Sequence, residues 1–157
     1  MGKNSLFIYV KDQRSLEDLT RLAKLNYEFV VVGQKTSEVL KALGISHITV
    51  GALEGVLGVV DSRFSLIMAN LPVREPVTHI YDIDICLSTL LITVIRTVST
   101  TVVVDPADYT NVVSALVGNN CLPATLENRL ATKADAHVAE IEKAVRNVRW
   151  RTKTVGR

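Results

Sequence analysis

The sequence predicts an α/β fold, a three-layer sandwich with a mostly parallel central sheet. Short apolar runs rich in β-branched residues, at 6–10, 29–32, 65–69 and 101–104, alternate with segments of helical periodicity. Such alternation is typical of a parallel sheet with helices on both faces. With 157 residues, 48% of them hydrophobic and 22% charged, the chain has the size and composition of one domain with its own core. We expect that domain over residues 1–148, followed by a basic tail over 149–157.

The amino-terminal third predicts two strand–helix units. Residues 6–10 (LFIYV) predict a strand, and Ser15 with an acid three residues later predicts a capped helix start. Residues 29–32 (FVVV) predict the next strand. A helix should follow Gly33 and end at Gly44, where a glycine commonly closes a helix.

The middle of the chain is less sharply patterned. Residues 48–50 predict a third strand, whereas residues 51–58, with three glycines, are compatible with a weak helix or a loop. Residues 65–69 predict a buried strand. The prolines in residues 70–81 predict an exposed, irregular connection. Residues 85–97 are rich in β-branched residues, which favour a strand, but their place between two strands favours a crossover helix.

The last third starts with a strand over residues 101–104. Asp105 is then a natural N-cap and Pro106 a natural first helical residue. A final, long amphipathic helix is predicted by an apolar stripe at spacings of three and four: Leu126, Leu130, Ala134, Val138, Ile141 and Val145.

Composition narrows the functional classes. Cys86 and Cys121 have no metal-ligand spacing, so we expect buried thiols in a reducing compartment and no metal site. The chain starts without a signal-peptide pattern, and its most apolar run has 13 residues, short of the roughly 20 that span a membrane. We therefore expect a cytoplasmic protein with no membrane contact. Residues 146–157 are basic but hold one aromatic residue, which favours a solvated terminus over a nucleic-acid site.

Three turns could carry chemistry, because ligands of parallel sheets bind where strands end and helices begin. The turn at residues 33–37 combines a glycine, a lysine and two hydroxyls, as a phosphate would require. The turn at residues 11–15 adds two cations, and residues 81–84 add paired carboxylates. The alternative for each turn is a plain helix cap or a solvated surface, which is the favoured interpretation for residues 11–15 and 81–84. The histidines are scattered and indicate neither a catalytic triad nor a metal cluster.

Three segments resemble a known family: residues 102–109 (VVVDPADY), residues 122–139 (LPATLENRLATKADAHVA) and residues 81–85 (YDIDI). They are similar to the IMP cyclohydrolase domain of the bifunctional enzyme that completes purine synthesis. The resemblance implies a methylglyoxal-synthase-like sandwich that closes the ring of formylated aminoimidazole carboxamide ribonucleotide to IMP, without cofactor or metal. It also implies a purine ribonucleotide monophosphate as ligand, a homodimer, and a transformylase as a separate domain or protein.

The same resemblance assigns site residues. Asp84 matches the aspartate of the family's IDIGG segment, and Arg96 falls where a functional lysine would lie; these are the expected catalytic residues. The family's phosphate turn carries a glycine pair where this chain has Gln34 and Lys35, and its RVKTLHP loop has no counterpart. Two hypotheses follow: a divergent IMP cyclohydrolase, or a catalytically degenerate homologue that binds a phosphorylated nucleotide or a protein partner. The expected phosphate- and substrate-binding residues are Lys11, Asp12, Gly33, Gln34, Lys35, Thr36 and Asn70.

Overall fold

The computed structural model describes residues 4–60, 64–72, 85–97 and 100–155. It confirms the predicted alternation of strands and helices. The strands are β1 (Ser5–Val10), β2 (Glu28–Val32), β3 (Ile48–Val50), β4 (Leu66–Asn70) and β5 (Thr101–Val103). The helices are η1 (Leu16–Asp18), α1 (Leu19–Ala23), α2 (Gln34–Ala42), α3 (Ala52–Val60), α4 (Ile85–Thr97), η3 (Pro106–Asp108), α5 (Tyr109–Asn119) and α6 (Ala124–Val155).

The strands form one parallel sheet in the order β3-β2-β1-β4-β5. β1 lies at its centre, with Phe7 opposite Val30 of β2 and Ile67 of β4. Residues 6–10 and 66–70 are buried throughout, because both faces of the sheet are covered. This double covering is why these strands read as unbroken apolar runs in the sequence.

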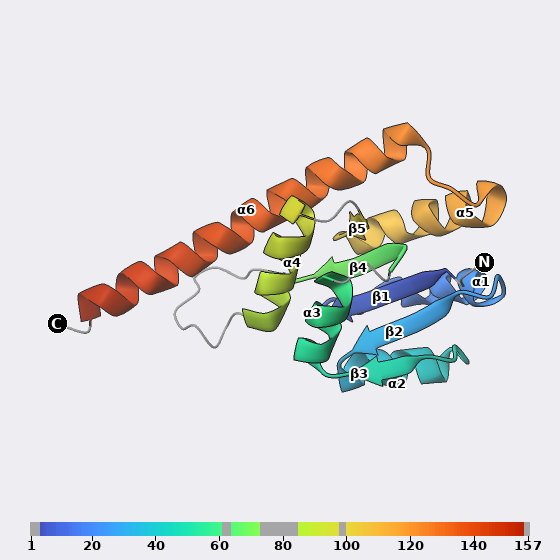
Figure 1. Cartoon of the computed structure of the whole chain (residues 1–157), viewed down its shortest axis with the longest axis horizontal. Helices are drawn as coiled ribbons and strands as arrows, with labels where there is room; N and C mark the ends of the chain where they lie inside the picture. The colour runs from blue at the N-terminus through green and yellow to red at the C-terminus, as the bar shows by residue number, and fades with distance from the viewer. Residues whose placement is uncertain (1–3, 61–63, 73–84, 98–99, 156–157) are drawn as a thin grey trace.

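Alternate side chains of the sheet feed two separate cores. Phe7 and Tyr9 face the layer that holds α3, α4 and the middle of α6. Leu6, Ile8 and Val10 face the layer that holds α1, α2 and α5. Figure 1 shows α3 and α4 on the near face of the sheet. The result is the predicted three-layer α/β sandwich.

Helix α6 covers the outer edge of β5 and joins both cores. Leu130 belongs to the core of α1, α2 and α5, whereas Val138, Ile141 and Ala144 belong to the other. The helix has 32 residues, a length of about 48 Å, and its end projects beyond the sheet (Figure 1). Because the helix continues to Val155, the boundary expected between residues 148 and 149 falls inside a helix.

Close packing of α3 on the sheet depends on Gly55. A Cβ built on this residue would lie 2.9 Å from the Phe7 ring and 2.9 Å from Val32 Cγ2. Residues 51–58, for which the sequence allowed either a helix or a loop, are mostly helical, since α3 begins at Ala52. The glycine at position 55 allows this helix to approach the strands closely.

Three local expectations were wrong. Ser15 adopts a left-handed conformation (φ 64°) and makes no side-chain cap, so the predicted capping box does not form. Cys86 and Cys121 are free and exposed rather than buried. Asn70, expected to begin an exposed connection, is the last residue of β4 and is 2% exposed. The rest of that connection, from residue 73 on, and the carboxylates of residues 81–84 lie outside the described residues.

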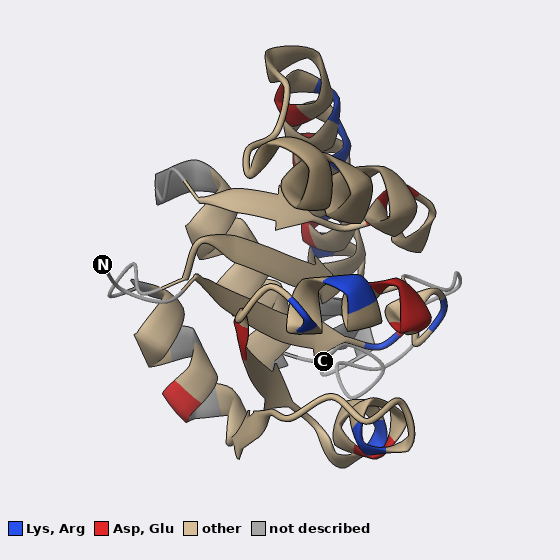
Figure 2. Cartoon of the chain, turned by 90° about the vertical axis from the view of Figure 1, so that its right-hand side faces the viewer, with Lys and Arg blue, Asp and Glu red and all other residues tan. Residues whose placement is uncertain are grey.

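Charged residues surround the sheet and are nearly absent from it. Figure 2 shows Lys, Arg, Asp and Glu on helices and turns, and among the strands only β2 carries one, at Glu28. Within the described part of the chain, no helix combines the length and apolarity needed to cross a bilayer.

Candidate functional site at the carboxyl ends of the strands

The order of the strands reverses beside β1. The chain proceeds from β1 outward through β2 to β3 and then returns to place β4 on the other side of β1. In open parallel sheets the helices on the two sides of such a point leave a crevice at the carboxyl ends of the strands, where ligands bind. Here that point lies between Val10 of β1 and Asn70 of β4, which are paired in the ladder.

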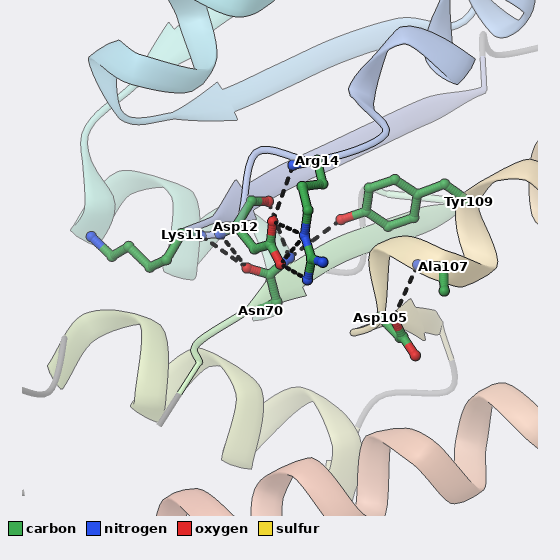
Figure 3. A network of polar contacts seen from close by, with 7 residues as sticks. All are labelled: Lys11, Asp12, Arg14, Asn70, Asp105, Ala107 and Tyr109. Atoms are coloured by element: carbon green, nitrogen blue, oxygen red, sulfur yellow. Dashed lines mark hydrogen bonds and ion pairs between the residues drawn. The ribbon is translucent and has the colours of Figure 1, made fainter. Parts of the chain in front are cut away.

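Asn70 shapes the turn that follows β1 (Figure 3). Its Oδ1 accepts hydrogen bonds from the backbone amides of Lys11, at 3.0 Å, and Asp12, at 2.8 Å. Its Nδ2 donates to the Tyr109 hydroxyl, at 3.3 Å, and to the Asp12 carbonyl, at 3.5 Å. The amide is thus fully used within the protein, so Asn70 positions the turn and offers no free group to a ligand.

Asp12 is held by a neighbouring cation. Arg14 Nε donates to both of its carboxylate oxygens, at 2.9 and 3.0 Å, and the Arg14 amide donates to Oδ1 at 3.1 Å. The Arg14 side chain lowers the pKa of the Asp12 carboxyl, with burial opposing it. Figure 3 shows the Lys11 side chain pointing away from this cluster.

The turn after β2 presents the first amide groups of α2. Gly33 has φ 100°, a conformation that favours glycine, and α2 begins at Gln34 with no side-chain cap. The first amides of a helix have no acceptor within it, so this end of α2 can bind an anion. Lys35 is exposed in the first turn. Thr36 is 1% exposed and donates to Gln13 Oε1 at 3.1 Å, which ties this turn to the one after β1.

A cleft of about 430 Å³ opens between the ends of β4 and β5 and the face of α6. Polar groups from four elements of the fold converge on it. Its lining comprises Asp12, Asn70, Pro72, Val104, Asp105, Pro106, Lys133, Ala136, His137 and Glu140.

An ion-pair cluster attaches α6 to the end of β5. Asp105 caps the following turn as predicted, accepting from the Ala107 amide at 3.0 Å. Lys133 Nζ lies 2.9 Å from both Asp105 Oδ2 and the buried Asp108 Oδ2. The Ala107 amide and Lys133 lower the pKa of Asp105, while Asp108 and Asp105 raise the pKa of Lys133. Lys133 is therefore a fixed cation in the wall of the cleft.

His137 lies one turn further along α6. Its Nε2 accepts a hydrogen bond from the Leu71 amide at 3.1 Å, directly after β4. Its Nδ1 is 4.0 Å from Glu140 Oε2, and the His137 side chain is 14% exposed. Burial lowers the pKa of the ring, and the Glu140 carboxylate opposes that shift.

The expected site residues divide into two groups. Lys11, Asp12 and Asn70 meet at the end of β1, and the turn at Gly33, Gln34, Lys35 and Thr36 adjoins them at the same edge of the sheet. Arg96 lies in the last turn of α4, and the residue before it, Ile95, borders a hollow at the amino end of β5 together with Thr101 and Val102, away from this edge. Asp84 lies outside the described residues.

Sequence reasoning missed Lys133, His137 and Glu140. Their spacing of four and three places them on one face of α6, a signal that was available in the sequence. It could not be read as a site without knowing that this face lies against the ends of β4 and β5.

The comparisons with known proteins support the architecture. No protein-family model and no curated protein matches the sequence. The chain is similar to the crystal structure of a protein named ForH, with a TM-score of 0.72 and 16% identity, over 94% of this chain and 99% of ForH. At that identity the likeness shows the fold, which is the α/β sandwich described above.

Proposed function

We propose that the protein binds a purine ribonucleotide monophosphate at the carboxyl edge of its sheet. The phosphate lies on the first amides of α2, and the ribose and base extend past the turn after β1 into the cleft beside α6. The observation that carries this proposal is the convergence, at the strand-order reversal, of an uncapped helix start and a polar cleft.

Lys35 supports the phosphate position. A cation in the first turn of a helix opposes the helix dipole and costs about 0.3–1 kcal/mol. α2 has no acidic residue in that turn to offset it. A bound phosphate removes this penalty, because the anion interacts favourably with both the helix end and the lysine.

The spacing of the strands supports the position of the base. β2 precedes the phosphate turn and β4 borders the cleft, with β1 between them. Adjacent strands are about 4.8 Å apart, so the two strand ends are about 10 Å apart. A mononucleotide can bridge that span.

Ring closure to IMP is the reaction that the family resemblance implies, and one observation favours it. His137, whose imidazole can take up and release a proton, lines the cleft where the base would lie, beside the fixed cation Lys133, and cyclisation with loss of water needs a proton carrier. In this proposal Lys133 and His137 take the catalytic roles that the resemblance assigned to Asp84 and Arg96. The alternative is a homologue that binds the nucleotide without reaction.

Calorimetric titration with IMP tests the binding proposal. At 100 times its dissociation constant, a ligand of the folded state adds about 2.7 kcal/mol to the free energy of unfolding. An absence of both heat and thermal stabilisation with IMP and AMP would refute it. An activity assay then distinguishes an enzyme from a protein that only binds the nucleotide. Its substrate is formylated aminoimidazole carboxamide ribonucleotide, and the change in absorbance reports formation of the purine ring. Loss of turnover in Lys133→Met and His137→Gln would support the reaction.

A further inference from the structure

The hydrogen bond between Leu71 and His137 fixes the tautomer of the imidazole. A backbone amide can only donate, so the Nε2 atom that accepts from Leu71 carries no proton. The neutral ring therefore holds its proton on Nδ1. The closest acidic oxygen, Glu140 Oε2, is 4.0 Å away, beyond hydrogen-bond distance. Within the described part of the chain, this N–H donor has no recorded acceptor.

Glu140 places a hydrogen-bond acceptor beside the N–H donor of His137. Its side chain is 69% exposed, its carboxylate accepts no recorded hydrogen bond from the described residues, and it lines the same cleft as His137. Other charged groups of the cleft are already engaged: Asp12 with Arg14, and Asp105 with Lys133. The cleft thus offers a ligand one N–H donor and one carboxylate acceptor side by side, from adjacent turns of one helix.

We propose that His137 and Glu140 recognise a planar ligand edge on which a hydrogen-bond acceptor adjoins an N–H donor. A carboxamide, the lactam edge of a 6-oxopurine and the amidine edge of a 6-aminopurine share this chemistry. The His137 Nδ1–H donates to the acceptor of the ligand, and Glu140 accepts from its N–H. This inference rests on the proposed function, since it takes the base of the nucleotide to occupy the cleft.

Four phosphorylated probes test the inference in the full chain: IMP, AMP, purine riboside 5′-monophosphate and ribose 5-phosphate. All four carry the same phosphate, but purine riboside monophosphate lacks the N–H donor and ribose 5-phosphate lacks the base. We expect IMP or AMP to bind at least about tenfold more tightly than purine riboside monophosphate, the value of one hydrogen bond to a charged acceptor. Ribose 5-phosphate should bind no more tightly than purine riboside monophosphate, because it lacks the whole base. A preference for IMP would identify the lactam edge, and one for AMP the amidine edge.

Two variants assign the recognition to these side chains. His137→Gln keeps an acceptor for the Leu71 amide but removes the Nδ1–H, and Glu140→Ala removes the carboxylate. Each should lower the affinity for the preferred nucleotide about tenfold and leave that for ribose 5-phosphate unchanged. Asp135→Ala, an exposed acid on the same helix that does not line the cleft, is the matched control and should change neither.

The outcomes separate the inference from the proposed function. Equal affinity for all four probes, or full discrimination retained in His137→Gln, would overturn the edge recognition while the phosphate site stands. No binding of any probe would overturn both. The midpoint of urea unfolding of each variant shows whether the fold is intact. If Glu140→Ala fails to fold, the affinities of the charge-neutral His137→Gln still test the inference.

Discussion

Asn70 organises the candidate site without contacting a ligand. Removing its side chain leaves the buried Tyr109 hydroxyl and the Asp12 amide without this partner, whereas the Lys11 amide keeps the Asn70 backbone carbonyl at 3.2 Å. We expect Asn70→Ala to lower the free energy of unfolding by about 2–4 kcal/mol. Urea unfolding measures this loss, and Asn111→Ala, at an exposed position of α5, should change it by less than about 0.5 kcal/mol. Equal effects of the two substitutions would show that the Asn70 hydrogen bonds contribute nothing.

His137 should make stability depend on pH. Burial lowers the pKa of the ring below the ordinary value of 6.5, so the unfolded chain binds a proton more readily than the folded one. The stabilisation is complete above pH 6.5 and is lost as the pH falls through the folded pKa. Protonation also places a second donor opposite the Leu71 amide.

The difference between the wild type and His137→Gln isolates this effect. Unfolding in urea should show the wild type losing stability relative to the variant between pH 7.5 and pH 5. Asp12, Asp105 and Lys133 are common to both proteins, so their contributions cancel in the comparison, whereas the effect of the Glu140 carboxylate on the His137 pKa is part of the measured difference. Parallel pH profiles would contradict the lowered pKa of the His137 ring.

Individual residues were predictable where the determining interaction is local. Asp105 and Pro106 form the expected cap because both act within one turn of the chain. Ser15 does not cap its helix, although the local pattern was favourable, because its backbone is left-handed. The burial of Asn70 depends on contacts with residues 58 and 59 positions away, which no local pattern reveals.

The packing of α3 gives a matched pair of glycine substitutions. A methyl group at Gly55 meets Phe7 and Val32 at 2.9 Å, whereas at Gly58 it meets the Phe64 ring at 3.5 Å, an ordinary contact. We expect Gly55→Ala to lower the free energy of unfolding by about 1–2 kcal/mol, since overpacking outweighs the gain in helix propensity. Gly58→Ala should raise it by about 0.5–1 kcal/mol. Thermal or urea unfolding of both variants checks the signs, and a stabilising Gly55→Ala would contradict the close approach.

Whole elements were predicted well where periodicity is strong. The stripe on α6 buries Leu130, Ala134, Val138 and Ile141 as expected, although Ala144 is more buried than Val145. α4 forms over the predicted residues despite its β-branched composition, because a parallel strand pair needs a crossover. Residues 51–58 stayed ambiguous because the glycine that weakens helix propensity is the one that lets α3 pack.

The architecture of the whole chain followed from the alternation of elements, but the site did not. Alternation predicts a parallel sheet with two covered faces, and the structure confirms it. The order of the strands is a non-local property, and it decides that the turns after β1 and β2 and the end of β4 form one edge. It also places Lys133 and His137, from the last helix, beside that edge.

The central claim is that an anionic phosphate lies at the start of α2. Two exposed lysines of this helix provide the test: Lys35 in its first turn and Lys41 in its last. Lys35→Glu should stabilise the free protein by about 0.3–1 kcal/mol, because an acid suits the helix start, whereas Lys41→Glu should destabilise it by a similar amount.

Calorimetric titration of both variants with IMP is the most direct measurement. Lys35→Glu should weaken IMP binding by at least about tenfold although the free protein is more stable, and Lys41→Glu should bind as the wild type does. Wild-type affinity in Lys35→Glu, or an equal loss in the two variants, would contradict a phosphate at the start of α2.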